Sequence, residues 1–176
     1  MRFPVRRAPR VALAAGPVAL LLLLLARPAR AESALLPLVD PRLGPVVERT
    51  VERAAARLAD PACAAVLRDF DDPRSGRPLA ETLAASGRSA PEFLASLRFV
   101  EADHMAPCRL RTPWAWVPVG GDVVFVCKGR FLSLVRKNEW LAGNVLVHEA
   151  LHALGLGENP PRSDEITQAV ARRCGS

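Results

Sequence analysis

The sequence predicts a small α+β domain in which most of the chain is helical and one β-hairpin lies between the helices. Apolar residues recur at helical spacing over much of residues 43–99 and again over residues 139–155. Between these segments, residues 113–127 change to the pattern of two short strands around a Gly-Gly pair. Because helices and strands are segregated along the chain, an α+β arrangement is favoured.

Residues 1–31 have the organisation of a secretory signal peptide. Arginines precede an uncharged apolar run over residues 11–26, and Ala29-Arg30-Ala31 is the small-x-small pattern that a signal peptidase cleaves. We therefore expect cleavage before Glu32 and a secreted or periplasmic mature protein without stable membrane association. An uncleaved membrane anchor is the alternative, because the apolar run is slightly longer than in a typical signal peptide.

The positive net charge of +6 comes entirely from this leader. Six of the 24 Lys and Arg residues lie in residues 1–31, where no Asp or Glu occurs, so residues 32–176 carry 18 of each sign. Because the mature chain is neutral, its net charge gives no reason to expect nucleic-acid binding, and we expect no nucleic-acid partner. Its length suits one domain with its own core, and the oligomeric state is left open.

The helical front, residues 43–99, is expected to contain four helices. They cover residues 43–58, 61–70, 78–85 and 91–97. The first has apolar residues at helical spacing between charged ones, so one face should pack on the core. Pro61 suits the first turn of the second helix, and Ser89 is placed to cap the last one.

A β-hairpin is predicted over residues 113–127. Its apolar strands flank Gly120-Gly121, and both glycines can adopt the positive φ that a tight hairpin turn requires. Pro118 has no backbone N–H to donate, so its strand is expected near the edge of the sheet. Residues 130–136 fit a short helix and a third strand equally well.

Four cysteines lie in the predicted mature chain, so two disulfides are expected in an exported protein. They are Cys63, Cys108, Cys127 and Cys174. Three pairings are possible, and the spacing does not choose among them. With the hairpin turn at the Gly-Gly pair, Cys127 lies opposite Trp114, so a direct cross-strand bond from Cys127 to Cys108 is not implied. No C-x-x-C pair suggests a cysteine-ligated metal.

A buried helix, capped by Asn138, is predicted over residues 139–155, because apolar residues cover nearly all of its sides. It contains His148, Glu149 and His152. Residues four apart share one helix face, so both imidazoles can reach one metal ion, with Glu149 beside it as a base rather than a ligand. A zinc ion facing a cleft would satisfy two otherwise unpaired histidines. Core histidines with backbone partners are the alternative.

The segment from His148 to Glu158, H-E-x-x-H-x-x-G-x-x-E, resembles the active-site helix of the zincin zinc metallopeptidases, with spacing similar to the metzincin branch. The resemblance implies a small zincin-like domain with a short twisted sheet over helices, and a substrate along an edge strand. It also implies Zn²⁺ as cofactor. His148, His152 and Glu158 would be the ligands, Glu149 the general base, and Gly155 the turn that brings the chain back beneath the metal.

The sequence departs from the metzincin pattern in two ways. Glu158 stands where His or Asp is usual, and no methionine follows it to form the methionine turn. Zinc accepts glutamate in the gluzincin branch, usually from a second helix, so Glu165 in an expected C-terminal helix over residues 163–173 is an alternative ligand. Asp164 and the loop residue His104 are further alternatives.

The chain has no tyrosine. Zincins often use Tyr, His or Arg to stabilise the oxyanion, so the resemblance leaves His104, Arg130, Arg162 or the zinc ion alone for this role. Together these observations predict an exported zinc metalloendopeptidase acting on a peptide or protein substrate, with Glu149 taking a proton from an activated water. The alternative is a non-catalytic, zinc-stabilised binding or scaffold domain. A disulfide-linked domain without metal is the third hypothesis.

Overall fold

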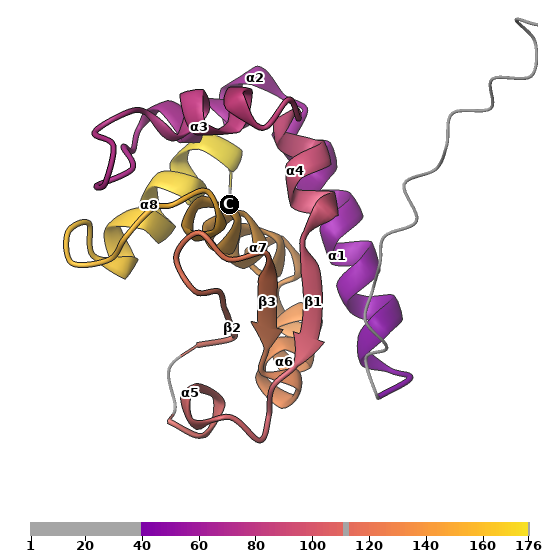
Figure 1. Ribbon diagram of the computed structural model, residues 1–176. Coiled ribbons are helices and arrows are strands. Elements are labelled where there is room, and N and C mark those ends of the chain that lie inside the picture. The colour runs from indigo at the N-terminus through magenta and orange to yellow at the C-terminus, as the bar shows by residue number, and fades with distance from the viewer. Residues whose placement is uncertain (1–39, 111–112, 176) are drawn as a thin grey trace, which may run out of the picture. The chain divides into compact units, whose positions relative to one another are not determined.

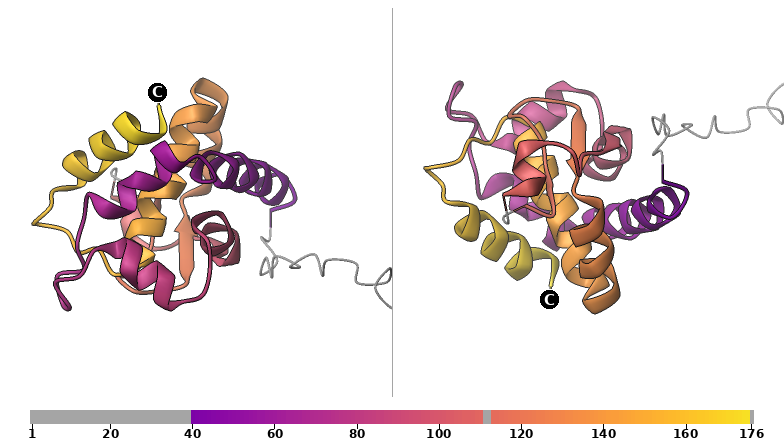
Figure 2. Two further views of the ribbon diagram at one scale, coloured as in Figure 1. Left: turned by 90° about the horizontal axis from the view of Figure 1, so that it is seen from above. Right: turned by 90° about the horizontal axis from the view of Figure 1, so that it is seen from below.

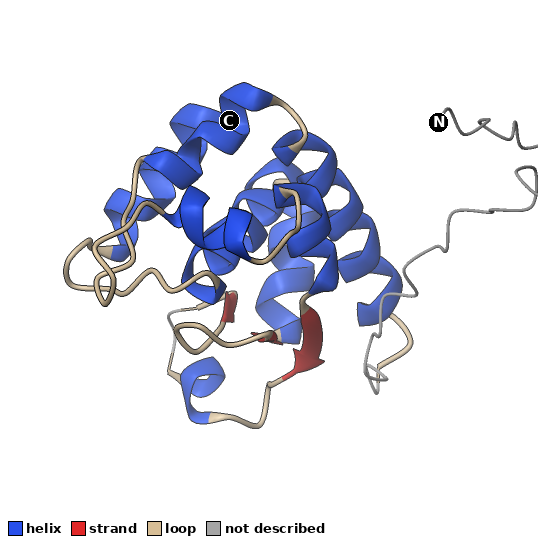
Figure 3. Ribbon diagram, turned by 45° about the horizontal axis from the view of Figure 1, so that its top comes forward, coloured by secondary structure: helices blue, strands red, loops and turns tan. Residues whose placement is uncertain are grey.

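The computed structural model describes residues 40–110 and 113–175, and the predicted signal peptide, residues 1–31, lies outside them. The described residues form an α+β domain with a small three-stranded mixed sheet (Figures 1 and 3). In chain order the elements are α1 (Leu43–Leu58), α2 (Pro61–Ala64), the 3-10 helix η2 (Ala65–Arg68), α3 (Leu79–Ala85), α4 (Ala90–Ser96), β1 (Arg98–Glu101), α5 (Ala106–Arg109), β2 (Ala115–Trp116), β3 (Val123–Val126), α6 (Lys128–Lys137), α7 (Glu139–Ala153) and α8 (Ser163–Cys174). None of the helices in the described ranges is long and apolar enough to cross a bilayer.

The main features of the predicted helical front are confirmed. Helix α1 has the expected bounds and buries the face that carries Leu43, Val47 and Ala54. Helix α4 begins with a capping box, in which the Ser89 side chain accepts from the Glu92 backbone N–H and the Glu92 carboxylate accepts from the Ser89 backbone N–H. Local sequence signals therefore place these two helices correctly.

The second predicted helix, residues 61–70, is shorter than expected. After α2 the chain continues only as η2, which ends at Arg68. The next residue, Asp69, accepts hydrogen bonds of 2.8 and 2.7 Å from the Arg173 guanidinium of α8. The ion pair between Asp69 and Arg173 therefore holds Asp69 just after the end of η2, where the sequence pattern predicted a further helical turn.

The predicted hairpin is formed by β2 and β3. Ala115 pairs with Val126 and Trp116 pairs with Phe125, so the strand register is the one predicted. The turn itself differs from the prediction, because only Gly120 of the two glycines has a positive φ, of 75°, and the Gly121 N–H donates to the Pro118 carbonyl at 2.7 Å. The tight turn therefore covers residues 118–121. The strand order is β1-β3-β2, so β2 lies at an edge, as the absence of a backbone N–H in Pro118 predicted.

The third strand, β1, corrects the predicted helical front, which extended to residue 99. It runs parallel to β3, with Phe99 beside Val124. Four residues are too few to show a clear period, and this strand forms because pairing with β3 satisfies its backbone groups. Residues 130–136, which fitted a helix and a strand equally well, belong to α6.

Helix α7 lies between α1 and α8 and also packs on α6 (Figure 2). Every residue from Ala142 to Ala153 is buried, so the prediction of a buried helix is confirmed. The Asn138 side chain caps its first turn by accepting from the Leu141 N–H at 2.9 Å. This packing fixes the position of the histidines that α7 carries.

The two disulfides join segments that are distant in the sequence. Cys63 pairs with Cys174 and links α2 to α8, and Cys108 in α5 pairs with Cys127 after β3. Cys127 donates its N–H to the Trp114 carbonyl at 2.9 Å, so it lies opposite Trp114 as predicted. Its disulfide partner comes from outside the hairpin. Two disulfides and no free cysteine are typical of proteins from oxidising compartments.

Candidate metal centre

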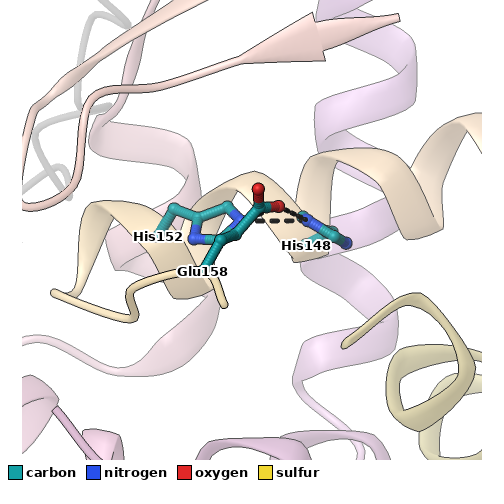
Figure 4. A group of neighbouring side chains, drawn as sticks. All are labelled: His148, His152 and Glu158. Atoms are coloured by element: carbon teal, nitrogen blue, oxygen red, sulfur yellow. Dashed lines mark hydrogen bonds and ion pairs between the residues drawn. The ribbon is translucent and has the colours of Figure 1, made fainter. Parts of the chain in front are cut away.

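His148, His152 and Glu158 converge on one point and could hold a metal ion (Figure 4). Their candidate ligand atoms all lie within 4.8 Å of one another. The Nε2 atoms of the two histidines are 3.0 Å apart, and Glu158 Oε1 lies 3.3 Å from His152 Nε2 and 3.8 Å from His148 Nε2. The three residues that the sequence predicted as ligands are therefore brought together.

The turn after α7 places Glu158 beside the histidines. Gly155 has a φ of 115°, and the Leu156 N–H donates to the Leu151 carbonyl while the Gly155 N–H donates to the His152 carbonyl. This is a Schellman motif with glycine at the position where the chain leaves the helix. The glycine predicted as the turn thus reverses the chain and returns a carboxylate to the helix face that carries both imidazoles.

The outer nitrogen of each imidazole has its own partner. His152 Nδ1 lies 2.7 Å from the Leu156 carbonyl oxygen, and His148 Nδ1 lies 3.1 Å from Thr167 Oγ1 in α8. Such contacts orient a histidine so that its other nitrogen faces a metal. Thr167 was not predicted as a site residue, because no local pattern indicates which α8 residue packs against α7.

Burial shifts the pKa values of two residues at this centre, His148 and Glu149. It lowers the pKa of His148 to about 3, and the neighbouring His152 adds to the effect, so His148 is neutral at neutral pH. A histidine ligand must be neutral. Burial and the negative charge of Glu158 raise the pKa of Glu149 well above 4.5. A hydrogen bond from the Val117 N–H acts in the opposite direction and lowers this pKa, but its effect is smaller. A cation held at this centre would favour the charged form of the Glu149 carboxyl.

The centre opens into a cleft of about 640 Å³. Its floor includes His148, Glu149 and His152, and its walls are largely apolar. The apolar wall residues include Leu110, Pro113, Trp114, Trp116, Val117 and Val119. Leu110, Trp114 and Val119 are also among the exposed large apolar residues of the described chain. The cleft therefore offers apolar surface beside a group that could hold a metal ion.

The alternative third ligands have other partners. The Glu165 carboxylate accepts from the Arg162 backbone N–H at 2.8 Å and caps α8, and the Asp164 carboxylate accepts from Arg162 Nε at 2.9 Å. His104 is exposed and does not belong to the group of potential ligands found among the described residues.

The two arginines considered for the oxyanion are also engaged elsewhere. Arg130 donates to the Cys108 carbonyl at 2.6 Å and to the Pro113 carbonyl at 3.1 Å, and Arg162 forms an ion pair with Asp164. Neither arginine lines the cleft in the described part of the chain.

Comparisons of the chain with protein-family models, with curated proteins and with solved structures gave no match. The resemblance to zincins therefore stays a prediction carried by residues 148–158. What the geometry establishes is coarser: an α+β domain with two disulfides, in which two histidines and a glutamate form a group that could hold a metal ion.

Proposed function

We propose that this protein is an exported, zinc-dependent peptidase that hydrolyses peptide bonds in the cleft above α7. The observation that carries the proposal is the convergence of His148 Nε2, His152 Nε2 and Glu158 Oε1 on the floor of an open cleft, with the Glu149 carboxyl on the same floor. Three protein ligands and an open position are the arrangement of catalytic zinc sites.

The donor set favours zinc over the harder cations. Two imidazole nitrogens and one carboxylate oxygen suit Zn²⁺, whereas Mg²⁺ and Ca²⁺ prefer oxygen ligands alone. The partners of both Nδ1 atoms, the Leu156 carbonyl and the Thr167 hydroxyl, supply the outer hydrogen bonds that zinc-binding histidines usually have. The residues present therefore fit a zinc ion.

Glu149 is the proposed general base. When bound, zinc would supply the positive charge that lowers the pKa of a water molecule and of Glu149 and that polarises the substrate carbonyl. The Glu149 carboxylate takes a proton from the water as its oxygen attacks the carbonyl carbon. The same carboxyl then gives the proton to the amine nitrogen as the C–N bond breaks. Its burial on the cleft floor keeps the carboxyl in one place for both transfers.

The cleft walls support a polypeptide substrate with large apolar side chains. Trp114, Val119 and Leu110 present exposed apolar surface along the cleft, and such surface binds apolar side chains by removing both from water. Strand β2 is an edge strand, so it also offers backbone groups for an extended chain. Export is supported by the two disulfides, and secretion or periplasmic location is the corresponding proposal.

A non-catalytic zinc-binding domain is the second candidate. It is favoured by one observation: the described residues that line the cleft include no Arg, Lys or Tyr to stabilise an oxyanion. In this case the cleft would bind a polypeptide without cleaving it.

One experiment separates the two candidates. The protein, produced in an oxidising compartment, is assayed for bound zinc by elemental analysis and for cleavage of apolar peptides by mass spectrometry, beside Glu149→Gln and the surface control Glu48→Gln. A peptidase is expected to contain stoichiometric zinc and to lose about 10²- to 10⁴-fold in rate only in E149Q. Zinc without cleavage would identify the binding domain, and absence of zinc would refute both.

A further inference from the structure

We propose that Arg130 is a positioning residue of the cleft, which holds two exposed apolar side chains, Leu110 and Trp114, at a fixed spacing and so determines a preference for polypeptides with a large apolar side chain. We call Leu110 and Trp114 the apolar rim. The inference rests on the part of the proposed function in which the cleft binds a polypeptide. It applies to a peptidase and to a non-catalytic binding domain alike.

The apolar rim lines the cleft but is not held by packing in the core. Leu110 is 69% exposed and Trp114 is 39% exposed, and both line the cleft. Neither belongs to the hydrophobic clusters that form the core of the described residues. Large apolar side chains that stay exposed beside a cleft are typical of a ligand-binding surface. Because the core does not fix them, their position depends on how the backbone next to them is held.

Arg130 joins the backbone of the two segments that carry the rim. Its Nη2 donates to the Cys108 carbonyl at 2.6 Å, and its Nη1 donates to the Pro113 carbonyl at 3.1 Å. Cys108 lies two residues before Leu110, and Pro113 lies directly before Trp114. The guanidinium is planar and rigid, so its nitrogens are held at a fixed separation. One side chain therefore fixes the distance between the two carbonyls and, through them, the spacing of the rim.

Helix α6 connects this contact to the floor of the cleft. Arg130 lies in the first turn of α6, next to Phe131, which is fully buried in the core. Helix α6 packs on α7, and α7 carries His148 and His152. The hydrogen bonds of Arg130 therefore place the rim relative to the candidate metal centre.

Two further bonds hold the rim segments at the start of α6. The Cys108–Cys127 disulfide holds the first segment, and the Cys127 N–H donates to the Trp114 carbonyl of the second at 2.9 Å. Each of these bonds reaches one segment. Among the described residues, Arg130 is the side chain whose hydrogen bonds reach both, so its removal should change the spacing between them.

Helix stability does not account for an arginine at this position. The first turn of a helix carries a partial positive charge, which disfavours cations. Lys128, the other cation in this turn, forms ion pairs with Asp40 and Glu101, whereas Arg130 donates to two backbone carbonyls. Hydrogen bonds from a charged donor are stronger than those between neutral groups. The Arg130 guanidinium does not line the cleft in the described chain, so it acts on a bound polypeptide through the rim.

The test measures peptide binding by Glu149→Gln protein with Zn²⁺ present, in which a bound peptide is not cleaved. The probes are two end-blocked hexapeptides of alanine and serine that differ in one central residue, which is phenylalanine in one and alanine in the other. Isothermal titration calorimetry gives both Kd values for this parent and for its Arg130→Met and Arg130→Lys variants. The matched control is Arg136→Met, which replaces an exposed arginine of the same helix.

We expect the parent to bind the phenylalanine peptide at least about tenfold more tightly than the alanine peptide, because the rim removes the ring from water. R130M should reduce this preference to about threefold or less. R130K should do the same, because an ammonium group cannot span both carbonyls in the fixed geometry of a guanidinium. R136M should keep the full preference. In all variants the Zn²⁺ affinity, measured by competition with a chelating dye, should stay within about twofold of the parent.

A double-mutant cycle tests whether Arg130 acts through the rim. Leu110→Ala combined with Trp114→Ala should abolish the preference, and R130M should then change the binding of neither peptide further. An effect of R130M that persists without the rim would overturn the proposal. The same conclusion would follow if R130M or R130K kept the full preference, if both variants lost the fold or the Zn²⁺ affinity, or if the parent bound the two peptides equally. A parent that binds neither peptide would overturn the proposed polypeptide-binding function and this role with it.

Discussion

Replacement of Glu149 by Gln tests the electrostatics of the cleft directly. Glu149 is 6% exposed, and its burial together with the charge of Glu158 raises its pKa well above 4.5. The hydrogen bond from the Val117 N–H lowers this pKa by a smaller amount. Glu149→Gln keeps the size of the side chain and removes the ionisable proton. We expect the metal-free E149Q protein to be more stable than metal-free wild type at neutral pH.

The magnitude follows from proton linkage. Between pH 4.5 and its raised pKa, Glu149 is protonated in the folded state and ionised in the unfolded state, so stability falls as pH rises. The fall is about 1.4 kcal/mol per pH unit for one proton. The unfolding free energy of E149Q should therefore exceed that of wild type, and the difference should grow by about 1.4 kcal/mol for each unit by which the pH rises above 4.5. His148, with its pKa lowered to about 3, gives the opposite slope up to pH 6.5 in both proteins and cancels in the difference.

Urea unfolding with a chelator present, followed by tryptophan fluorescence at several pH values, measures this margin. Glu48→Gln on the exposed face of α1 is the control and should change the unfolding free energy by less than about 0.5 kcal/mol. A margin between E149Q and wild type that does not change with pH would refute the conclusion that burial keeps Glu149 protonated.

Further predictions concern the disulfides, the turn and the metal. Removal of the Cys63–Cys174 disulfide, which spans 111 residues, should lower the unfolding free energy by about 4.8 kcal/mol. Removal of the Cys108–Cys127 disulfide, which spans 19 residues, should lower it by about 3.2 kcal/mol, because a shorter loop restricts the unfolded chain less. Equal losses in urea unfolding would contradict this chain-entropy argument. Gly155→Ala should cost about 1 to 3 kcal/mol because its φ is 115°, and should also weaken Zn²⁺ binding, which dye competition measures. When free zinc exceeds its Kd about a thousandfold, its removal with a chelator should lower the unfolding free energy by about 4 kcal/mol. A melting curve that the chelator leaves unchanged would argue against a bound metal.

The elements that follow from short-range signals could be predicted from the sequence. The caps at Ser89 and Asn138 and the register of the β2–β3 hairpin depend on contacts between residues near one another in the sequence, so the local sequence contains them. Strand β1 was missed because it depends on β3, more than twenty residues later. The hydrogen bonds between β1 and β3 stabilise it, and its own four residues give too weak a pattern to reveal them.

The candidate site divides in the same way. His148 and His152 share a face because four residues make about one helical turn, and Gly155 allows the reversal that returns Glu158. These contacts are local and were predicted. The partnership of Thr167 with His148 is set by the packing of α8 on α7 and could not be read from the sequence.

The sequence by itself determined an α+β domain, the helix that carries the histidines, and the turn that follows it. The tertiary structure decided the disulfide pairing, the parallel strand β1 and the contacts that Thr167 and the Val117 N–H make with site residues. The physical reason is the range of the interactions. Side-chain spacing, caps and turns act within a few residues, whereas pairings between distant segments depend on how all the helices pack around α7.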